Sequence, residues 1–374
     1  MSLQRHLSEE PSPADRGRAF GTAHRQAVEN TVAVYRRLFA ESCELGPSDV
    51  QQFGEDVEAT LASRLPGVLE EIAGIASGAN VSTAELVAIN ARTELLAGQT
   101  EPECTVVACQ PHSASAPCLF AQTWDWHPAL EASRVVWTVH AEGRWFVTLT
   151  EAGILAKLGL NSAGLACGLN FLTSSVDGGA SGIPIHILLR LLLGECSTPG
   201  DALRLLLNTK TSASSCITIS FADSEAAVIF GVELSPAGAR VVPTCDRGTF
   251  VHTNHFLAKP HDLTDVGLVE WPGTLVRFQH VKRKLAELDA APNEQALTAI
   301  LKSHFAAPDS VCKHEIDAEP WPERRRTLVA VLLNLTDRTF NISDGPPCEA
   351  AWQRVPLPAD RAELHAPIVA GDPA

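Results

Sequence analysis

The chain has 374 residues, 45% hydrophobic and 20% charged, which fits a globular protein of one large or two ordinary domains. Its formal net charge of −15 argues against a nucleic-acid partner, because the densest basic cluster, Arg324-Arg325-Arg326, is only three residues long. The longest apolar run, 183–193, contains His186 and Arg190 and is too short to cross a bilayer, so we expect no membrane partner.

Cysteine usage and the first residues bear on metal binding and cell location. The ten cysteines are scattered, with no Cys-x-x-Cys pair and no histidine at zinc spacing, so we expect reduced thiols and no metal site. Residues 1–18 are polar and lack the apolar core of a signal peptide. These features predict a cytoplasmic location.

The first quarter of the chain has a helical pattern. Residues 1–14 are rich in Ser, Glu and Pro and predict a disordered lead-in, and the helical region follows over 15–103. Ser82 followed by Glu85 is a capping-box pattern, which starts the last helix by binding its unpaired amides. Apolar residues recur at intervals of three and four over 27–39, 57–75 and 84–96.

The pattern becomes β-rich after residue 100. Short strand-like runs, separated by Gly, Asn or Glu-Gly turns of hairpin length, predict antiparallel pairing. The predicted strands are 105–109, 118–124, 135–140, 145–150, 154–160, 165–169, 217–221, 227–233, 328–335 and 339–342. The predicted helices are 184–193, 199–207 and 274–288. The residues alone indicate an α+β class, and no glycine-rich phosphate loop points to a nucleotide cofactor.

Two side chains in the early strands are candidates for chemistry. Cys104 opens one apolar run, and Asp125 stands between Trp124 and Trp126 in the next. A carboxylate flanked by bulky aromatics loses water and keeps its charge only when a fixed donor or cation faces it. Pairing of the two strands would aim the thiol and the carboxylate, although a single cysteine taken alone is more often an inert buried thiol.

Five motifs follow one another along the chain, and two further segments, 90–95 and 327–348, accompany them. The motifs are Cys104-Thr105, Gln122-Thr123-Trp124-Asp125-Trp126, Gly159-Leu160-Asn161-Ser162-Ala163-Gly164-Leu165, Gly168-Leu169-Asn170-Phe171 and His252-Thr253-Asn254-His255-Phe256. In order and spacing they resemble the isopenicillin N acyltransferase (acyl-coenzyme A:6-aminopenicillanic acid acyltransferase) family of self-processing N-terminal nucleophile hydrolases.

This resemblance implies a fold and a processing event. The expected fold is a four-layer αββα sandwich of two antiparallel sheets, preceded by a helical leader. Cleavage between Glu103 and Cys104 would separate the leader, 15–103 with its lead-in, from a catalytic body, 104–374. The two pieces are expected to stay associated, and the sequence leaves a homo-oligomer open.

The resemblance also assigns roles within the expected active site. Cys104 would be the nucleophile, and Asp125 would hold the hydrogen-bond network of its thiol or terminal ammonium. Asn170 and Asn254 match positions that line the site, with Asn254 donating to the oxyanion, although an isolated asparagine often just ties down a loop. Arg326 would fix charge near the nucleophile, and its neighbours Arg324 and Arg325 compete for that role.

A cysteine at a new chain terminus carries its own base. The ordinary pKa of an α-amine is about 7.7 to 8, so it can take up the thiol proton near neutral pH and return it to a leaving amine. His252 and His255 flank Asn254 at a spacing of three, but no third ligand stands nearby in the sequence, so we do not expect them to bind a metal.

Glu103 departs from the family pattern, which usually has glycine before the nucleophile. Glycine reaches twisted backbone conformations more easily, so a glutamate there predicts slow self-cleavage. A glutamate could instead serve as a local base, and the sequence leaves both readings open.

The leading hypothesis is an enzyme that forms an acyl thioester on Cys104 and passes the acyl group to water or an amine. Its substrate would be a small N-acyl amine or acyl thioester, with no cofactor. The alternative is a non-catalytic binding protein of the same fold that stays uncleaved because of Glu103. A third reading, an uncut papain-like cysteine hydrolase, requires a histidine close to Cys104 in space.

Overall fold

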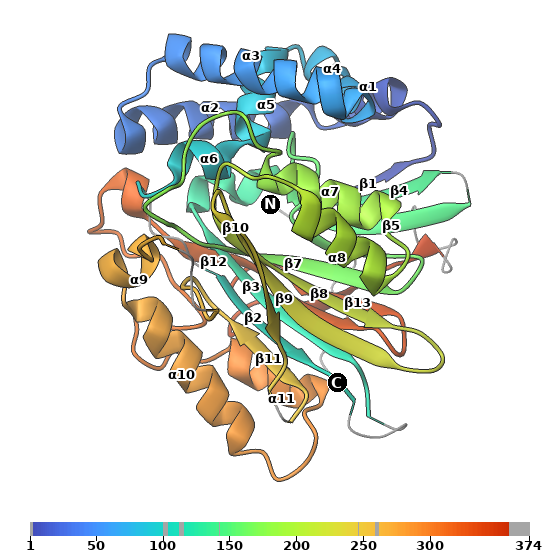
Figure 1. Ribbon diagram of the computed structural model, residues 1–374, viewed down its shortest axis with the longest axis vertical. Helices are drawn as coiled ribbons and strands as arrows, with labels where there is room; N and C mark the ends of the chain where they lie inside the picture. Colours follow the sequence, from blue (N-terminus) through green and yellow to red (C-terminus); the bar gives the residue numbers. More distant parts are fainter. Residues whose placement is uncertain are drawn as a thin grey trace.

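A computed structural model describes residues 3–99, 104–111, 116–141, 143–245, 247–258 and 262–358 (Figure 1). Within these ranges the chain forms an eight-stranded sheet and a six-stranded sheet, with helices on their outer sides. This arrangement confirms the α+β class and the layered sandwich that the sequence predicted. No helix in the described part of the chain is both long and apolar enough to cross a membrane.

The eight-stranded sheet is an antiparallel meander from its second strand onward. Its order is β1-β4-β5-β6-β7-β8-β9-β10. The strands are β1 (Gln4–Ser8), β4 (Arg134–Ala141), β5 (Arg144–Glu151), β6 (Leu158–Asn161), β7 (Leu165–Phe171), β8 (Ser215–Ala222), β9 (Ala227–Ser235) and β10 (Gly238–Pro243). Neighbours along the chain pair with neighbours in space, which is why hairpin-length turns predicted most of this sheet.

The first strand corrects two predictions. The sequence predicts disorder over residues 1–14, but β1 pairs with β4, and it does so in parallel, so the sheets are not wholly antiparallel. Leu3 is buried, Trp137 donates a hydrogen bond to the Ser8 hydroxyl at 3.0 Å, and the His6 ring packs edge-on against Phe20. A polar segment can be ordered by backbone pairing along an existing sheet edge, and composition does not reveal that edge.

The six-stranded sheet brings the candidate nucleophile and carboxylate together. Its order is β11-β2-β3-β12-β13-β14. Antiparallel register sets Cys104 opposite Trp124, and Asp125 opposite Thr327. The strands are β11 (Thr249–His252), β2 (Cys104–Cys109), β3 (Leu119–Trp126), β12 (Arg326–Asn334), β13 (Thr339–Ser343) and β14 (Trp352–Val355).

Strand alternation divides the core into layers. In β2, Val106 and Ala108 belong to the large core shared with the eight-stranded sheet, whereas Val107 and Cys109 belong to a second cluster on the opposite face. That second cluster packs against α10 (Gly273–Ala286) and α11 (Glu294–Leu301). Helices α7 (Ile185–Glu195) and α8 (Pro199–Asn208) cover the eight-stranded sheet. The order of layers is therefore helices, sheet, sheet, helices.

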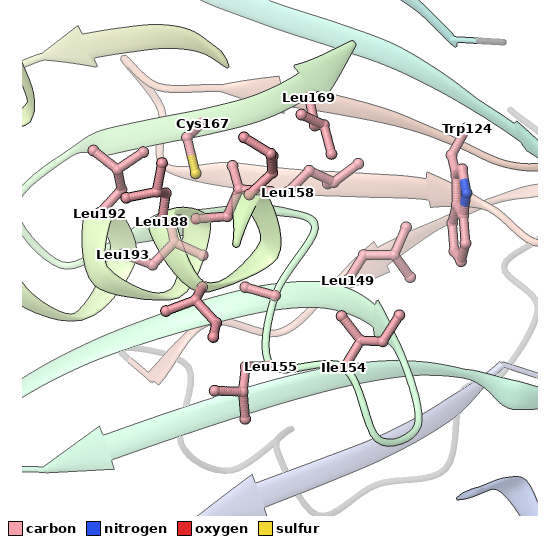
Figure 2. Close-up of a cluster of buried hydrophobic side chains, with 14 of the residues drawn as sticks. Trp124, Leu149, Ile154, Leu155, Leu158, Cys167, Leu169, Leu188, Leu192 and Leu193 are labelled. Atoms are coloured by element: carbon pink, nitrogen blue, oxygen red, sulfur yellow. The ribbon is translucent and has the colours of Figure 1, made fainter. Parts of the chain in front are cut away.

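Figure 2 shows how α7 packs on its sheet. Leu188 and Leu192 of the helix lie against Cys167 of β7 and Leu158 of β6, and all four are buried. Trp124 of the other sheet is buried near Leu149 in the same view. Trp124, which precedes Asp125 in β3, thus forms part of the main core, which limits its movement.

The leader helices gather over one end of the sheets, at the top of Figure 1. The predicted helix over 57–75 is broken at Leu65, since Pro66 cannot donate a backbone hydrogen bond and begins a new helix. Ser82 accepts a hydrogen bond from the Glu85 amide at 3.4 Å, which confirms the serine half of the predicted capping box, whereas the Glu85 carboxylate pairs with Arg36. The helices are α1 (Pro13–Ala23), α2 (Arg25–Cys43), α3 (Pro47–Arg64), α4 (Pro66–Ala79), α5 (Thr83–Asn90) and α6 (Arg92–Leu96).

Buried polar contacts fasten these helices to the sheets. The Asn90 side chain donates to the Gly153 carbonyl at 2.7 Å and accepts from the Leu155 amide at 3.0 Å. Glu71 of α4 forms an ion pair with Arg190 of α7 at 3.0 Å. Leader and body side chains also share one hydrophobic cluster. The helical region is therefore a layer of the same folded unit.

Candidate active site

Three side chains from distant parts of the chain bind the backbone of Cys104. The Cys104 amide donates to Asn254 Oδ1 at 3.0 Å, and its carbonyl accepts from Asn170 Nδ2 at 3.0 Å. Arg277 Nη1 donates to the same carbonyl at 3.2 Å. In an ordinary strand the backbone amide and carbonyl of the first residue would bind neighbouring strands or water. Here the side chains of Asn254, Asn170 and Arg277 bind them, and we call these three side chains the cradle of Cys104.

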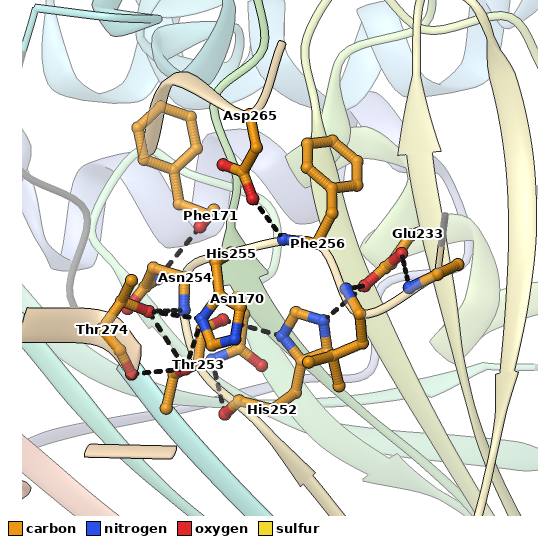
Figure 3. A network of polar contacts seen from close by, with 12 residues as sticks. Asn170, Phe171, Glu233, His252, Thr253, Asn254, His255, Phe256, Asp265 and Thr274 are labelled. Atoms are coloured by element: carbon orange, nitrogen blue, oxygen red, sulfur yellow. Dashed lines mark hydrogen bonds and ion pairs between the residues drawn. The ribbon is translucent and has the colours of Figure 1, made fainter. Parts of the chain in front are cut away.

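The Asn254 amide has a defined orientation. Its oxygen accepts from Cys104 and from Arg277 Nη2 at 3.0 Å, and its nitrogen donates to the Phe171 carbonyl at 3.0 Å. The bond to Phe171 is visible in Figure 3. Because an amide nitrogen carries two N–H groups, the bond to Phe171 leaves the second one for another acceptor.

A buried network supports the loop that carries Asn254 (Figure 3). His252 Nε2 contacts Glu233 Oε1 at 2.9 Å, and the Glu233 carboxylate also accepts the Leu257 amide. Burial alone would lower the pKa of His252, but the nearby Cys216 thiol and the Glu233 carboxylate raise that pKa to about 10. The His255 ring contacts the Thr274 hydroxyl at 3.0 Å. Both histidines therefore help to hold the loop that carries Asn254 in place.

Asp125 is buried among hydroxyl groups. Its carboxylate accepts from Thr327 at 2.6 Å and from Thr123 at 3.2 Å. Burial raises the pKa of Asp125 to about 7, although the two hydroxyls and the charge of Arg277 favour the carboxylate. Thr123 also accepts the Thr105 amide at 3.2 Å, so the Asp125 network is anchored to the strand that begins with Cys104.

The Cys104 thiol faces a small cavity in the uncleaved chain. Desolvation, reinforced by the charge of Asp125, raises the pKa of the thiol to about 11. The cavity has a volume of about 30 Å³, close to the share of one water molecule in the liquid. It is lined by Arg92, Thr93, Cys104, Gln122, Trp124, Asp125, Trp126, Lys157, Leu158, Leu169 and Phe171. The apolar part of this wall, Trp124, Trp126, Leu158, Leu169 and Phe171, offers a surface on which an acyl group could pack.

Two cations at this cavity were not predicted from the sequence. Lys157 lies 3.0 Å from Glu151 and 4.8 Å from the centre of the Trp124 ring, and burial lowers its pKa to about 7. Arg92, from the leader helix α6, stacks on Trp126 at 4.5 Å. Lys157 lies outside the five motifs, and Arg92 lies in the segment 90–95 that is part of the resemblance but was given no role there. The leader thus contributes a side chain directly to the cavity wall.

Comparisons with known proteins bear on this geometry. The family model described as acyl-coenzyme A:6-aminopenicillanic acid acyl-transferase matches residues 112–347, which is more than half of the chain. The chain belongs to this family. Membership confirms the predicted resemblance and the enzyme class, amide hydrolysis or acyl transfer. The match begins after Cys104, so it does not itself include the proposed nucleophile.

Individual relatives are more distant. The acyl-coenzyme A:6-aminopenicillanic-acid-acyltransferase 40 kDa form of Emericella nidulans is 27% identical over 346 residues, covering 91% of this chain and 93% of that protein. Penicillin V acylase from Agrobacterium tumefaciens is 16% identical with a TM-score of 0.45, over 67% of this chain and 86% of that one. A mutant conjugated bile acid hydrolase from Clostridium perfringens is 12% identical with a TM-score of 0.40, over 67% and 97%.

The arginine at the cradle differs from the one expected in this family. Arg326 contacts Glu131 at 3.2 Å and is partly exposed, whereas Arg277 contacts the Cys104 carbonyl. Arg325 stacks on Trp126 at 4.9 Å, and Arg324 contacts Glu315 at 3.3 Å. Arg277 sits mid-helix in α10 without a motif around it, so no signal in a single sequence could have singled it out.

Two predictions concern groups next to the thiol. Glu103 lies outside the described residues, so the predictions about its backbone stay predictions. Within the described ranges no imidazole contacts the Cys104 thiol, which disfavours the papain-like reading that requires one.

Proposed function

We propose that the chain cleaves itself between Glu103 and Cys104 and then works as an N-terminal cysteine amide hydrolase or acyltransferase. The supporting observation is the cradle that holds the backbone nitrogen and oxygen of Cys104 with Asn254, Asn170 and Arg277. That nitrogen is the atom that cleavage would convert into a free amine. A cradle built for it therefore serves both the precursor and the mature enzyme.

In the first step the Cys104 sulfur attacks the Glu103 carbonyl carbon. The peptide C–N bond breaks, the nitrogen takes up the thiol proton, and a thioester links Glu103 to Cys104. Water then hydrolyses the thioester, which releases the Glu103 carboxylate and the free thiol. The leader remains bound, because its helices share the core and β1 pairs within the eight-stranded sheet.

In turnover the new α-amine replaces an external base. A thiol with its pKa near 11 is protonated at neutral pH, and the adjacent amine has an ordinary pKa of about 7.7 to 8. The sulfur attacks the substrate amide carbonyl, and the second Asn254 N–H stabilises the oxyanion. The leaving amine takes a proton from the α-ammonium, and water or an acceptor amine resolves the thioester.

The carboxylate of Asp125 supports this cycle electrostatically. Its pKa near 7 in the uncleaved chain falls once a terminal ammonium forms close by, because an opposite charge favours the ionised form. The Thr327 and Thr123 hydroxyls keep it oriented throughout.

The substrate is a small N-acyl amine or acyl thioester whose acyl group enters the cavity beside Trp124 and Trp126. A cavity of about 30 Å³ is much smaller than the pockets of about 300 Å³ or more that usually hold small ligands, so the pocket must widen when an acyl chain enters. We expect the site to work in the cytoplasm. The first donor and acceptor to assay are acyl-coenzyme A and 6-aminopenicillanic acid, the pair that the family is named after.

Intact-mass analysis of the purified protein tests this proposal. Cleavage gives a leader of 103 residues and a body of 271, and sequencing of the body should begin Cys-Thr-Val-Val. An uncut chain that hydrolyses amides at full rate would overturn the mechanism. An uncut chain without activity would instead support the alternative of a non-catalytic binding protein.

A further inference from the structure

Four metal-ligating side chains converge beside the six-stranded sheet, outside the candidate active site. His304 follows α11, Cys312 and His314 lie in the connection to β12, and Cys348 follows β13. Their ligand atoms all lie within 4.8 Å of one another. Cys312 is buried, Cys348 is half-buried, and the two histidines are exposed, so an ion could enter from solvent.

Four of the six distances between these atoms are close to those of a tetrahedral zinc centre, and the other two, from His304 to the two sulfurs, are within 4.8 Å. With Zn–S near 2.3 Å and Zn–N near 2.05 Å, tetrahedral angles separate two sulfurs by about 3.8 Å, sulfur and nitrogen by about 3.6 Å, and two nitrogens by about 3.3 Å. The two sulfurs are 3.6 Å apart, and the two Nε2 atoms are 3.1 Å apart. His314 Nε2 lies 3.3 Å from Cys348 Sγ and 3.8 Å from Cys312 Sγ.

We infer that His304, Cys312, His314 and Cys348 bind one Zn²⁺ in a structural Cys₂His₂ site. Two thiolates and two imidazoles favour zinc over the oxygen-seeking cations Mg²⁺ and Ca²⁺. Four protein ligands complete the tetrahedron and leave no open position for substrate or water, which is typical of structural rather than catalytic sites.

Surrounding contacts hold the ligands in place. His314 Nδ1 lies 3.4 Å from the Glu349 carboxylate, the usual outer partner of a zinc-bound imidazole. The Cys312 amide donates to the Ser303 carbonyl at 3.0 Å, and its carbonyl accepts from the Ser310 hydroxyl at 2.6 Å. These bonds fix the backbone on which a buried thiol sits.

The site would also steady the Asp125 network. Lys313, between two of the ligands, donates its amide to the Thr327 hydroxyl at 2.8 Å and accepts the Thr327 amide at 3.1 Å. The Thr327 hydroxyl in turn donates to Asp125 at 2.6 Å. A metal at this cluster therefore fastens the loop that orients the catalytic carboxylate.

This inference departs from the expectation of no metal site. The ligands stand at 304, 312, 314 and 348, a spacing unlike the Cys-x₂₋₄-Cys and His-x₃₋₅-His pairs that mark zinc sites in a sequence. Folding of the connection before β12 against the turn after β13 brings them together.

Metal analysis of the untagged protein tests the inference. Protein made in zinc-supplemented medium and dialysed against metal-free buffer should retain one zinc per chain by mass spectrometry of the elements. Cys312→Ser and His314→Ala should each lower the bound zinc at least tenfold. Cys245→Ser and His140→Ala, outside the cluster, are the matched controls and should keep it.

Cobalt provides a readout that does not depend on activity or on any variant folding. Co²⁺ exchanged into the wild-type protein should give the visible absorption of a tetrahedral ion with thiolate charge-transfer bands. Wild-type protein that retains almost no zinc and shows no such spectrum would overturn the inference, as would a Cys312–Cys348 disulfide in protein isolated without reductant.

Discussion

Two cysteine-containing regions of this molecule hold their thiols in opposite ways. At Cys104, neighbouring side chains bind the backbone, and the thiol is left facing a cavity. At Cys312 and Cys348, the side chains converge on one another and on two imidazoles. A thiol meant to attack a carbonyl must stay free while its backbone is fixed, whereas thiols meant to hold an ion must point at a common centre.

The largest effect should come from comparing the two kinds of cysteine. Cys104→Ala should abolish self-cleavage completely and leave an intact, inactive chain, because no other group can form the thioester. Cys312→Ser should still cleave while losing its metal. Gel electrophoresis together with metal analysis separates the two outcomes, and cleavage of Cys104→Ala would show that another residue is the nucleophile.

Next in size is the loss of the oxyanion donor. Asn254→Ala should fold but lose about two to three orders of magnitude in turnover, as when one preorganised donor is removed from other acyl-transfer sites. Steady-state kinetics of protein that has already been cleaved keeps this effect apart from processing. Wild-type turnover in this variant would remove Asn254 from the oxyanion role.

The two arginines give a smaller and more discriminating comparison. Arg277→Gln removes charged hydrogen bonds to the Cys104 carbonyl and to Asn254, so self-cleavage should slow about ten- to hundredfold. Arg326→Gln breaks a partly exposed pair with Glu131 and should change the rate less than about fivefold. A time course of precursor loss measures both. The reverse ranking would restore Arg326 to the role that the sequence predicted.

The smallest effect concerns pH and stability. The pKa of Asp125 is about 7 in the folded chain and about 3.9 when unfolded, so the folded state favours the protonated acid. Its stabilising contribution is full below about pH 4 and disappears as the pH rises towards 7. In a Cys104→Ala background, Asp125→Asn should therefore reduce the fall in melting temperature between about pH 4 and pH 7.

Asp56→Asn is the control for that experiment, since Asp56 is an exposed carboxylate on α3 that accepts a hydrogen bond from the neutral Gln52 side chain at 3.1 Å. It should leave the fall in melting temperature unchanged. An equally steep fall in the Asp125→Asn protein would show that other carboxyl groups, such as the buried Glu94, account for the pH dependence.

Much of the fold could be predicted from short sequence patterns. Short β-rich runs, most of them joined by hairpin-length turns, predicted ten of the strands, and Ser82 marked the start of a helix, because these signals depend on residues a few positions apart. The strands β1, β10, β11 and β14 and the break at Leu65 were missed. Strand β1 depends on a distant sheet edge, and the break depends on a single proline.

By itself the sequence determined the α+β class, the family and the candidates Cys104, Asp125, Asn170 and Asn254, through motifs whose residues are adjacent in the chain, and the order of the layers followed only from the family resemblance. The tertiary structure decided which side chains reach them. Arg277 meets Cys104 across 173 positions, and the four ligands of the proposed zinc site come from three separate segments. Such contacts depend on how helices and loops pack against the sheets. Residues that meet only in the folded structure form no local sequence pattern from which their contact could be predicted.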